Sequence, residues 1–415
     1  MTRSEYTNDM SASYVPPPGN SLLPACENRR MPDPGDRDAD HRPSPAPASS
    51  VHPVVEPSSA PPWQAVAPGL TVDRPPELSG KRITLAVLSL LLVAALLWWG
   101  LPWAAGASWP QILDSLAGLP VWAVPAMLLL GLGALALEAW TVRTAVPGSS
   151  YRTVLQGHAA ASAMALAIPG GGMLGTGLLG WILRRTGLAL SVVITGIVAA
   201  SLVEMLVTTV LVPLLGGIAY VAAGMVTDAR IDLPGAALWA ALAAVVGAVF
   251  ALVLAAALLR RPVLAGLLET AATVTGAGSD DADRFTAFVL GQRDALVTLL
   301  RERPVALVGP TALARVLQWL ALVLAIEAVG GSVHLLLTVA IFALGRVLSL
   351  VPLTPGGAGI TETVGAAALV GLGLGAAASA SAMLLLAITT LVVPLVAGGI
   401  AAATAVSRTG PRSPA

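Results

Sequence analysis

The chain has one cysteine, Cys26, among its 415 residues, and this excludes an intramolecular disulfide. It has four histidines, and no group of histidine, cysteine and carboxylate residues shows the spacing of a metal site. Charged residues make up 11% of the chain, whereas an average soluble protein carries roughly 25%. The low charge excludes an ordinary soluble domain. No Gly-x-Ser-x-Gly sequence is present, so that nucleophile motif is absent as well.

Apolar residues are what the chain has in abundance. They make up 56% of the sequence, the formal net charge is zero, and several apolar runs are long enough to cross a bilayer. The polar residues cluster near the N-terminus and in short loops. This pattern predicts an all-α polytopic membrane protein.

The first 80 residues differ from the rest in composition. They hold 16 of the 32 prolines, together with runs of serine and alanine. Such a segment buries too little apolar surface to offset its ordering entropy, so we predict a disordered cytoplasmic tail. It lacks the apolar core of a signal peptide. It serves either as a docking tail for a cytoplasmic partner or as a variable solvated tail. We expect the transmembrane domain at 81–407 and a C-terminal tail at 408–415.

Six apolar segments are long enough to span the membrane. They are Ile83–Trp103, Leu119–Trp140, Leu188–Val212 (with apolar sequence continuing to Val226), Pro234–Leu259, Pro304–Ala328 and Ala380–Val406. The longest internal loop, 262–303, contains apolar residues at helical spacing between Asp281 and Arg301. This spacing predicts an amphipathic helix on the inner membrane surface.

Two further apolar segments are interrupted by proline and glycine. One break is Pro169-Gly170-Gly171-Gly172, and the other is Pro355-Gly356-Gly357-Ala358-Gly359. Proline removes an N–H and glycine frees the backbone, so we expect the helix to end at each break. Broken backbone is tolerated in lipid where protein or a watery cavity satisfies its polar groups. Corresponding breaks in two halves of a chain indicate a transport site.

The basic residues predict the orientation. They precede the first span, follow the second span and the first break, fill the loop 262–303 and occur in the C-terminal tail. The chain is then a multi-pass protein of the cell (inner) membrane, and the positive-inside rule places both of its termini on the cytoplasmic side. The first break becomes a re-entrant hairpin from the inside and the second a hairpin from the outside, as in an inverted repeat. The arms of the second hairpin could instead cross fully, which would raise the count from six spans to eight.

Six ionisable residues fall within the apolar segments, where they are costly and usually face a cavity or one another. They are Glu138, Glu204, Arg315, Glu327, Arg346 and Glu362. The functional hypothesis is that Arg346 and Arg315 attract an anionic group, most simply a lipid phosphate, because the guanidinium fork suits phosphate oxygens. Glu204 and Glu362 would then orient the arginines or the hairpin backbone.

The structural alternative is that Arg346–Glu362 and Arg315–Glu327 are buried ion pairs that lock helices. Glu138 and Glu327 lie near the ends of predicted spans, so we expect both to snorkel to the interface. We expect His158, at the start of the first hairpin, to be interfacial as well. Gly171 and Gly175 are spaced for close helix packing.

The segment Leu350–Glu362 resembles the PGG-x-G-x-x-E signature of the lysylphosphatidylglycerol synthase transmembrane-region family, the flippase-like membrane domain of multiple peptide resistance proteins. In the first half, Pro169, Gly172 and Glu204 match the family pattern. The resemblance covers roughly Ile83 to Val406. The chain departs from the family at Thr176 and Met205, where the family has arginines.

The resemblance implies a lipid translocase that moves an anionic or polyprenyl-linked lipid headgroup across the membrane. It implies no synthase activity, because aminoacyl transfer in bifunctional relatives belongs to a separate soluble domain. We expect no cofactor, and small-residue helix faces leave a homodimer open. The expected substrate site comprises Arg346, Glu362, Pro355, Gly356, Gly357, Gly359, Pro169, Gly172, Glu204 and Arg315.

A different class of function is a non-transporting scaffold that recruits a cell-envelope enzyme through the tail. Deleting residues 1–80 separates the two hypotheses. A scaffold loses its function without the tail, whereas a translocase keeps its headgroup translocation rate. The measurement is complementation in cells, paired with translocation in proteoliposomes.

Overall fold

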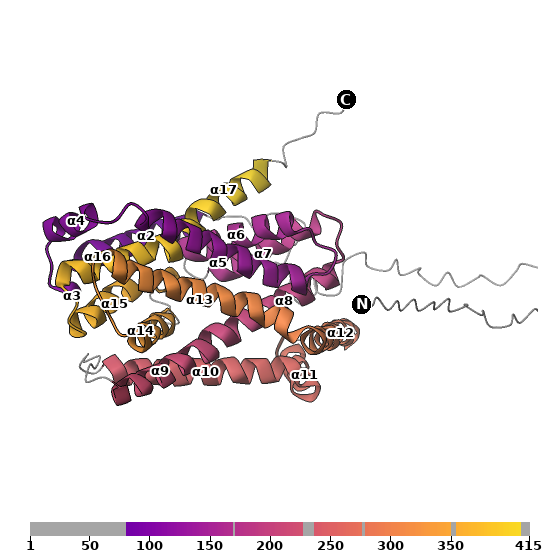
Figure 1. The fold of residues 1–415 in the computed structure, drawn as a ribbon. Coiled ribbons are helices and arrows are strands. Elements are labelled where there is room, and N and C mark those ends of the chain that lie inside the picture. Colours follow the sequence, from indigo (N-terminus) through magenta and orange to yellow (C-terminus); the bar gives the residue numbers. More distant parts are fainter. Residues whose placement is uncertain (1–79, 169–170, 227–235, 276–278, 350–353, 408–415) are drawn as a thin grey trace, which may run out of the picture. The chain divides into compact units, whose positions relative to one another are not determined.

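The computed structural model describes residues 80–168, 171–226, 236–275, 279–349 and 354–407, and helices joined by short turns and loops make up this part of the chain (Figure 1). The N-terminal tail, Pro169 and the segment 350–353 lie outside the described residues. The predicted all-α class is therefore confirmed for the part of the chain that the structure describes.

Long apolar helices dominate the described residues. Five of them are long and apolar enough to cross a membrane, and six when α10 and α11 count as one bent pair. The candidate spans are α2 (Gly80–Ala95) with η1 (Leu96–Gly100) and α3 (Leu101–Ala105); α5 (Ala123–Ala145); α8 (Leu190–Leu206) with η2 (Val207–Leu211) and α9 (Val212–Val226); α13 (Pro304–Ala328); and α16 (Ala376–Ala387) with η4 (Ile388–Val392) and α17 (Val393–Ser407). The bent pair consists of α10 (Ala236–Leu259) and α11 (Arg261–Thr275).

Three crossing helices pass a proline without ending there. The π-helical turns η1, η2 and η4 each end two residues before Pro102, Pro213 and Pro394 respectively. A wider turn relieves the clash between a proline ring and the carbonyl four residues earlier, but it leaves that carbonyl without its helical donor. At Pro102 the carbonyl in question is that of Trp98, and Trp109 Nε1 donates to it at 2.8 Å. The apolar runs therefore continue as helices where a proline alone would predict a stop.

Two pairs of shorter helices form hairpins. The first pair is α6 (Tyr151–Ala167) and α7 (Gly171–Arg184), and the second is α14 (Leu335–Leu348) and α15 (Ile360–Gly371). With 14 and 12 residues, α14 and α15 rise about 21 and 18 Å, short of the roughly 30 Å hydrocarbon core. These lengths favour the predicted broken hairpin over the eight-span alternative.

Glycines allow α6 to pack closely against two neighbours. A Cβ added at Gly171 or Gly175 of α7 would lie 2.2 or 2.5 Å from a carbonyl oxygen of α6. A Cβ at Gly398 of α17 would lie 2.1 Å from the carbonyl oxygen of Ala159. The prediction that Gly171 and Gly175 serve helix packing is confirmed. The first hairpin is consequently held to the bundle through backbone contacts.

The internal loop is more regular than predicted. A helix is present where one was expected, as α12 (Ser279–Glu302), and its place on the membrane surface stays a prediction; a second helix, α11 (Arg261–Thr275), precedes it and was not predicted. α11 bends by 90° from α10 at Arg260. Arg293 of α12 donates from Nε to the carbonyl of Leu259 at 3.0 Å, and this caps the end of α10. The bend and the cap join both loop helices to one end of the bundle.

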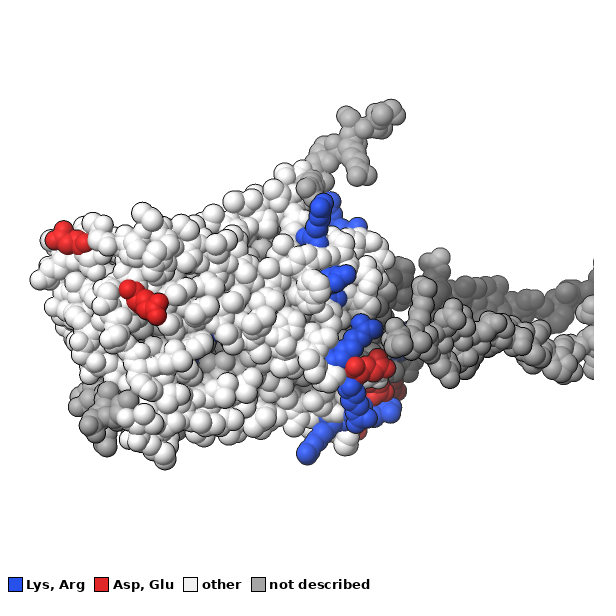
Figure 2. Space-filling model, in the orientation of Figure 1, with Lys and Arg blue, Asp and Glu red and all other residues white. Residues whose placement is uncertain are grey.

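Basic side chains mark that end of the bundle. Figure 2 shows lysine and arginine gathered at one end of the visible face, and Arg143, Arg184 and Arg301 occupy the last turns of α5, α7 and α12. The hairpin α6–α7 begins and ends at this basic end. α13 runs from the basic end to the opposite one, and α14 follows it there (Figure 1). The two hairpins therefore enter the bundle from opposite ends.

Two glycines of α7 give a matched test of the hairpin packing. Gly175→Ala places a Cβ 2.5 Å from the Ala161 carbonyl oxygen, so we expect it to destabilise the protein by about 1–3 kcal/mol. Gly177→Ala meets nothing within 4 Å, and we expect a gain of up to about 1 kcal/mol from helix propensity. Unfolding free energies in detergent micelles measure both. Changes of the same sign would contradict the packing described here.

Candidate functional site

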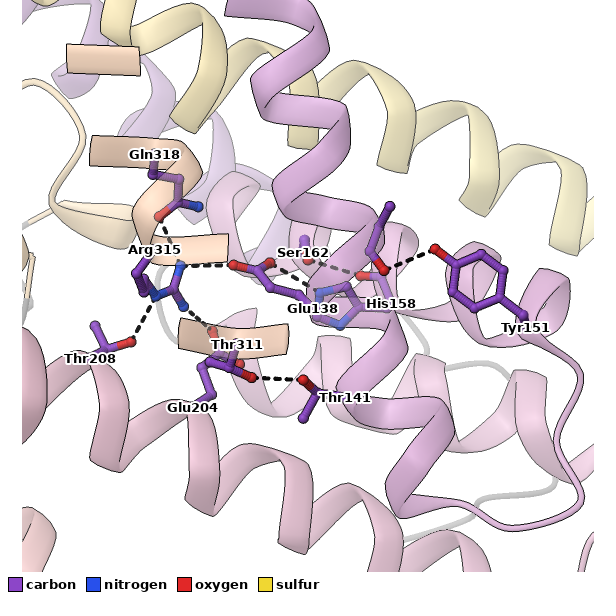
Figure 3. A network of polar contacts seen from close by, with 11 residues as sticks. Glu138, Thr141, Tyr151, His158, Ser162, Glu204, Thr208, Thr311, Arg315 and Gln318 are labelled. Carbon is purple, nitrogen blue, oxygen red and sulfur yellow. Dashed lines mark hydrogen bonds and ion pairs between the residues drawn. The ribbon is translucent and has the colours of Figure 1, made fainter. Parts of the chain in front are cut away.

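The centre of the bundle holds a buried arginine that joins three helices (Figure 3). Arg315 of α13 donates from Nη1 to Glu138 Oε1 at 2.8 Å and to Gln318 Oε1 at 2.9 Å. Its Nη2 donates to Glu204 Oε1 at 3.1 Å, and its Nε donates to Thr208 Oγ1 at 3.1 Å. The residue is 6% exposed. Four polar partners around one buried guanidinium offset much of the cost of removing its charge from water.

The network reaches a fourth helix through histidine. Glu138 Oε2 lies 3.3 Å from Nε2 of His158 on α6, and His158 is 8% exposed. On the same helix, Tyr151 Oη donates to the carbonyl of Ala136 on α5 at 2.9 Å. α6 is thus fixed to α5 at both its first turn and its middle.

The predicted interfacial roles of Glu138 and His158 are wrong. The predicted span ended at Trp140, but α5 continues to Ala145, so Glu138 lies about two turns inside the helix end. At that depth its carboxylate pairs with Arg315 and His158 instead of reaching the headgroups. The extent of the apolar run misplaced the end of the helix.

The predicted ion pairs are also corrected. Arg315 pairs with Glu138 and Glu204, whereas Glu327 at the end of α13 is exposed, as the snorkelling prediction expected. Arg346 and Glu362 form no ion pair among the described contacts. The sequence had suggested that both Arg315 and Arg346 form buried ion pairs. Among the described residues, the structure shows ion pairs for Arg315.

Arg346 differs from Arg315 in having no polar partner among the described residues. Its guanidinium lies 5.1 Å from the centre of the Phe342 ring, and no hydrogen bond or ion pair holds it in the described part of the chain. It lines a cavity of about 280 Å³. A guanidinium that faces such a cavity within an apolar bundle is suited to an anionic ligand.

Glu362 holds the second break in shape. Its Oε2 accepts from the N–H of Gly359 at 2.6 Å and so caps α15, and the side chain is buried. Gly356, Gly357 and Gly359 have φ angles of 60°, 74° and 82°, which residues with a Cβ rarely adopt. Of the two roles predicted for Glu362, the structure supports the one toward the hairpin backbone.

Two cavities meet at the arginine network. The 280 Å³ cavity is lined by Arg346, Glu362, Gly356 and Arg315, and a second cavity of about 580 Å³ is lined by α5 to α8. Glu138, Ser162, Ala165 and Glu204 line both cavities. Gly356 also approaches the first hairpin, since a Cβ there would lie 2.7 Å from Leu166 Cδ2. The second break and α6 therefore border the same polar interior.

Most predicted site residues gather around these cavities. Arg346, Glu362, Gly356, Glu204 and Arg315 line the smaller cavity, and Gly172 and Glu204 line the larger one. Pro355, Gly357 and Gly359 lie in the break beside them, and Pro169 falls outside the described residues. Sequence reasoning missed Glu138, His158, Gln318 and Thr208. Gln318, three residues after Arg315, carried a usable signal because it shares the polar face of an apolar helix. Within the described ranges, no group of ligating side chains could hold a metal ion.

Comparison with known families identifies one match. Residues 86–398 match the family described as the lysylphosphatidylglycerol synthase TM region, and the matched region contains both breaks and the whole arginine network. No curated protein sequence matches the chain.

The two arginines predict different effects on stability. Arg315→Ala leaves Glu138 buried without its cation, and we expect a loss of about 3–5 kcal/mol. Adding Glu138→Gln to that variant should recover about 1–3 kcal/mol, because the two residues are coupled. Arg346→Ala should cost less than about 1 kcal/mol, since it leaves no ion-pair partner behind. Unfolding titrations of the four proteins test this, and equal losses for both arginines would contradict it.

Proposed function

The chain belongs to the lysylphosphatidylglycerol synthase transmembrane-region family, and from that premise we propose that it translocates a lipid headgroup across the inner membrane. The substrate is an anionic phospholipid or a polyprenyl-linked phosphate lipid. The lipid tails stay in the bilayer while the headgroup passes through the polar interior of the bundle.

The observation that carries this proposal is Arg346, whose guanidinium has no hydrogen-bond or ion-pair partner among the described residues of the apolar bundle. Arg346 lies eleven residues into α14, about 17 Å along the helix from the end opposite the basic side chains. A cation at this depth is costly unless a cavity, water or a counter-charge faces it. A lipid phosphate offers that counter-charge, and charge-assisted bonds from guanidinium to phosphate are among the strong polar contacts.

The neighbouring groups support an anion at this position. Arg315 is already occupied by Glu138 and Glu204, so its charge is largely compensated. Glu362 is engaged by the Gly359 N–H and does not pair with Arg346. Arg346 is consequently the guanidinium in the smaller cavity whose N–H groups have no hydrogen-bond partner among the described residues, and these groups are left for a phosphate.

The arrangement of the hairpins supports transport rather than static binding. Gly356 of the second break lies close to Leu166 near the end of α6, although the hairpins enter from opposite ends. We propose that the two hairpins form an inverted repeat, which would offer alternating access to one central site. Under the positive-inside rule, the basic end is cytoplasmic, and both termini are then cytoplasmic too.

Translocation in proteoliposomes tests the proposal. Purified protein is reconstituted with phosphatidylglycerol that carries a fluorophore on one acyl chain, and a parallel sample contains a polyprenyl phosphate. We expect Arg346→Ala to lower the translocation rate at least about tenfold, because a charge-assisted hydrogen bond contributes about 1.5–3 kcal/mol. Arg346→Lys should retain part of the rate, since it keeps the charge without the planar fork. Glu362→Gln should lower it by a smaller factor.

The matched control is Arg301→Ala, which removes an exposed arginine at the basic end. It should leave the rate unchanged. Wild-type rates in both Arg346→Ala and Glu362→Gln would overturn the assigned site, and wild-type liposomes with no translocation of either lipid would overturn the function.

A further inference from the structure

Glu204 is an exposed carboxylate deep in an apolar helix. α8 begins at the basic end with Leu190, and Glu204 lies fourteen residues further, about 21 Å along the axis. Its side chain is 49% exposed, whereas the Arg315 side chain with which it pairs is 7% exposed. A carboxylate at this depth cannot face lipid tails, because ionisable groups in the hydrocarbon region require polar surroundings. The opening beside Glu204 must therefore admit water or the polar groups of a ligand.

The opposite wall of this opening is the start of α7. Gly172, Met173 and Thr176 are exposed there, and Met173 reaches 85%. These residues line the 580 Å³ cavity together with Ser201 and Glu204 of α8, both of which are exposed. Thr176 Oγ1 donates to the carbonyl of Gly172 at 2.9 Å, which satisfies that carbonyl and leaves the hydroxyl oxygen as an acceptor. Exposed residues on two neighbouring helices that line one cavity define an opening between those helices.

The other side of α7 is closed. Gly171 and Gly175 press against carbonyl oxygens of α6, so the hairpin arms pack too closely to admit a ligand between them. The larger cavity adjoins the smaller one, because Glu138, Ser162, Ala165 and Glu204 line both. The cavity at the α7–α8 opening is therefore the neighbour of the cavity that Arg346 lines.

We propose that the α7–α8 opening is the lateral entry site through which a phosphate-bearing lipid headgroup reaches Arg346. This inference rests on the proposed function and adds the route to it. Met173, Thr176 and Ser201 line the mouth, and Glu204 lies at its inner end. The lipid tails remain outside between α7 and α8, because the exposed surface of Met173 is apolar. Glu204 is a positioning residue that keeps Arg315 occupied while the phosphate passes to Arg346.

The test uses a lipid that reacts through its headgroup. In phosphatidylethanolamine with a maleimide on its amine, the phosphate keeps its negative charge and the reactive group sits beyond it. The protein carries Cys26→Ser, which removes the single native thiol, and one new cysteine at Met173. The maleimide reaches this thiol when the headgroup descends to the tip of the first hairpin.

The matched control is Val249→Cys in α10. Met173 precedes Arg184 by eleven residues and Val249 precedes Arg260 by eleven, so both lie about 17 Å from the basic end. Both side chains are exposed, Met173 at 85% and Val249 at 54%, and Val249 lines neither cavity. Each lipid reaction rate is divided by the rate with membrane-permeant N-ethylmaleimide, which corrects for the reactivity of each thiol.

We expect the normalised lipid-adduct rate at Met173→Cys to exceed that at Val249→Cys at least about tenfold. Arg346→Ala in the Met173→Cys protein should lower the adduct rate several-fold, because the phosphate loses its cation. Equal normalised rates at the two positions would overturn the entry site.

The outcome separates this inference from the proposed function. If wild-type protein translocates lipid while Met173→Cys forms no more adduct than Val249→Cys, the headgroup enters elsewhere and the entry site is wrong. If Met173→Cys forms the adduct while wild-type liposomes translocate nothing, the opening binds headgroups and the translocase function is wrong.

Discussion

The ion pairing of Arg315 is the interaction on which the interior depends. It joins α13 to α5 and α8 directly, and to α6 through Glu138 and His158. Lipid tails cannot satisfy these charges, so the helices must keep the positions that pair them. Removing one member of such a network destabilises a protein by several kcal/mol, whereas replacing the whole network by apolar residues is often neutral or stabilising. The network therefore defines where helices lie more than how stable they are.

Arg315 pairs with Glu138 and Glu204, whereas Arg346 has no hydrogen-bond or ion-pair partner among the described residues. The difference between the two arginines follows from the direction in which the three nearby glutamates point. Glu138 and Glu204 extend to Arg315, while Glu362 is turned to the N–H of Gly359. Three glycines at positive φ make that turn possible, and the carboxylate caps the helix that follows. The described part of the second break thus lines the smaller cavity, and its carboxylate is engaged by the backbone N–H of Gly359.

The first hairpin supplies the complementary feature. Its glycines seal α7 against α6, and the same seal leaves the opposite face of α7 open beside α8. The first hairpin therefore lines the larger cavity and the second lines the smaller one, and Glu138, Ser162, Ala165 and Glu204 line both. Under the proposed translocase function, movement of either hairpin would change access to the headgroup site.

Composition and periodicity by themselves determined the class of protein, the crossing segments and the two breaks. Pro304–Ala328 agrees with α13 residue for residue, and the helix at Asp281–Arg301 was recognised from its spacing. The amino-acid sequence also marked Glu204, Arg315, Arg346 and Glu362, because an ionisable side chain in an apolar run is costly wherever it points. Tertiary structure alone decided which of these charges meet. Glu138 and His158 are 20 residues apart and Glu138 and Arg315 are 177 apart, so helix packing, and no local pattern, brings them together. Pro102 shows the same limit. Local chemistry predicts a helix break there, but the π-helical turn η1 and the Trp109 donor to the Trp98 carbonyl allow the helix to continue.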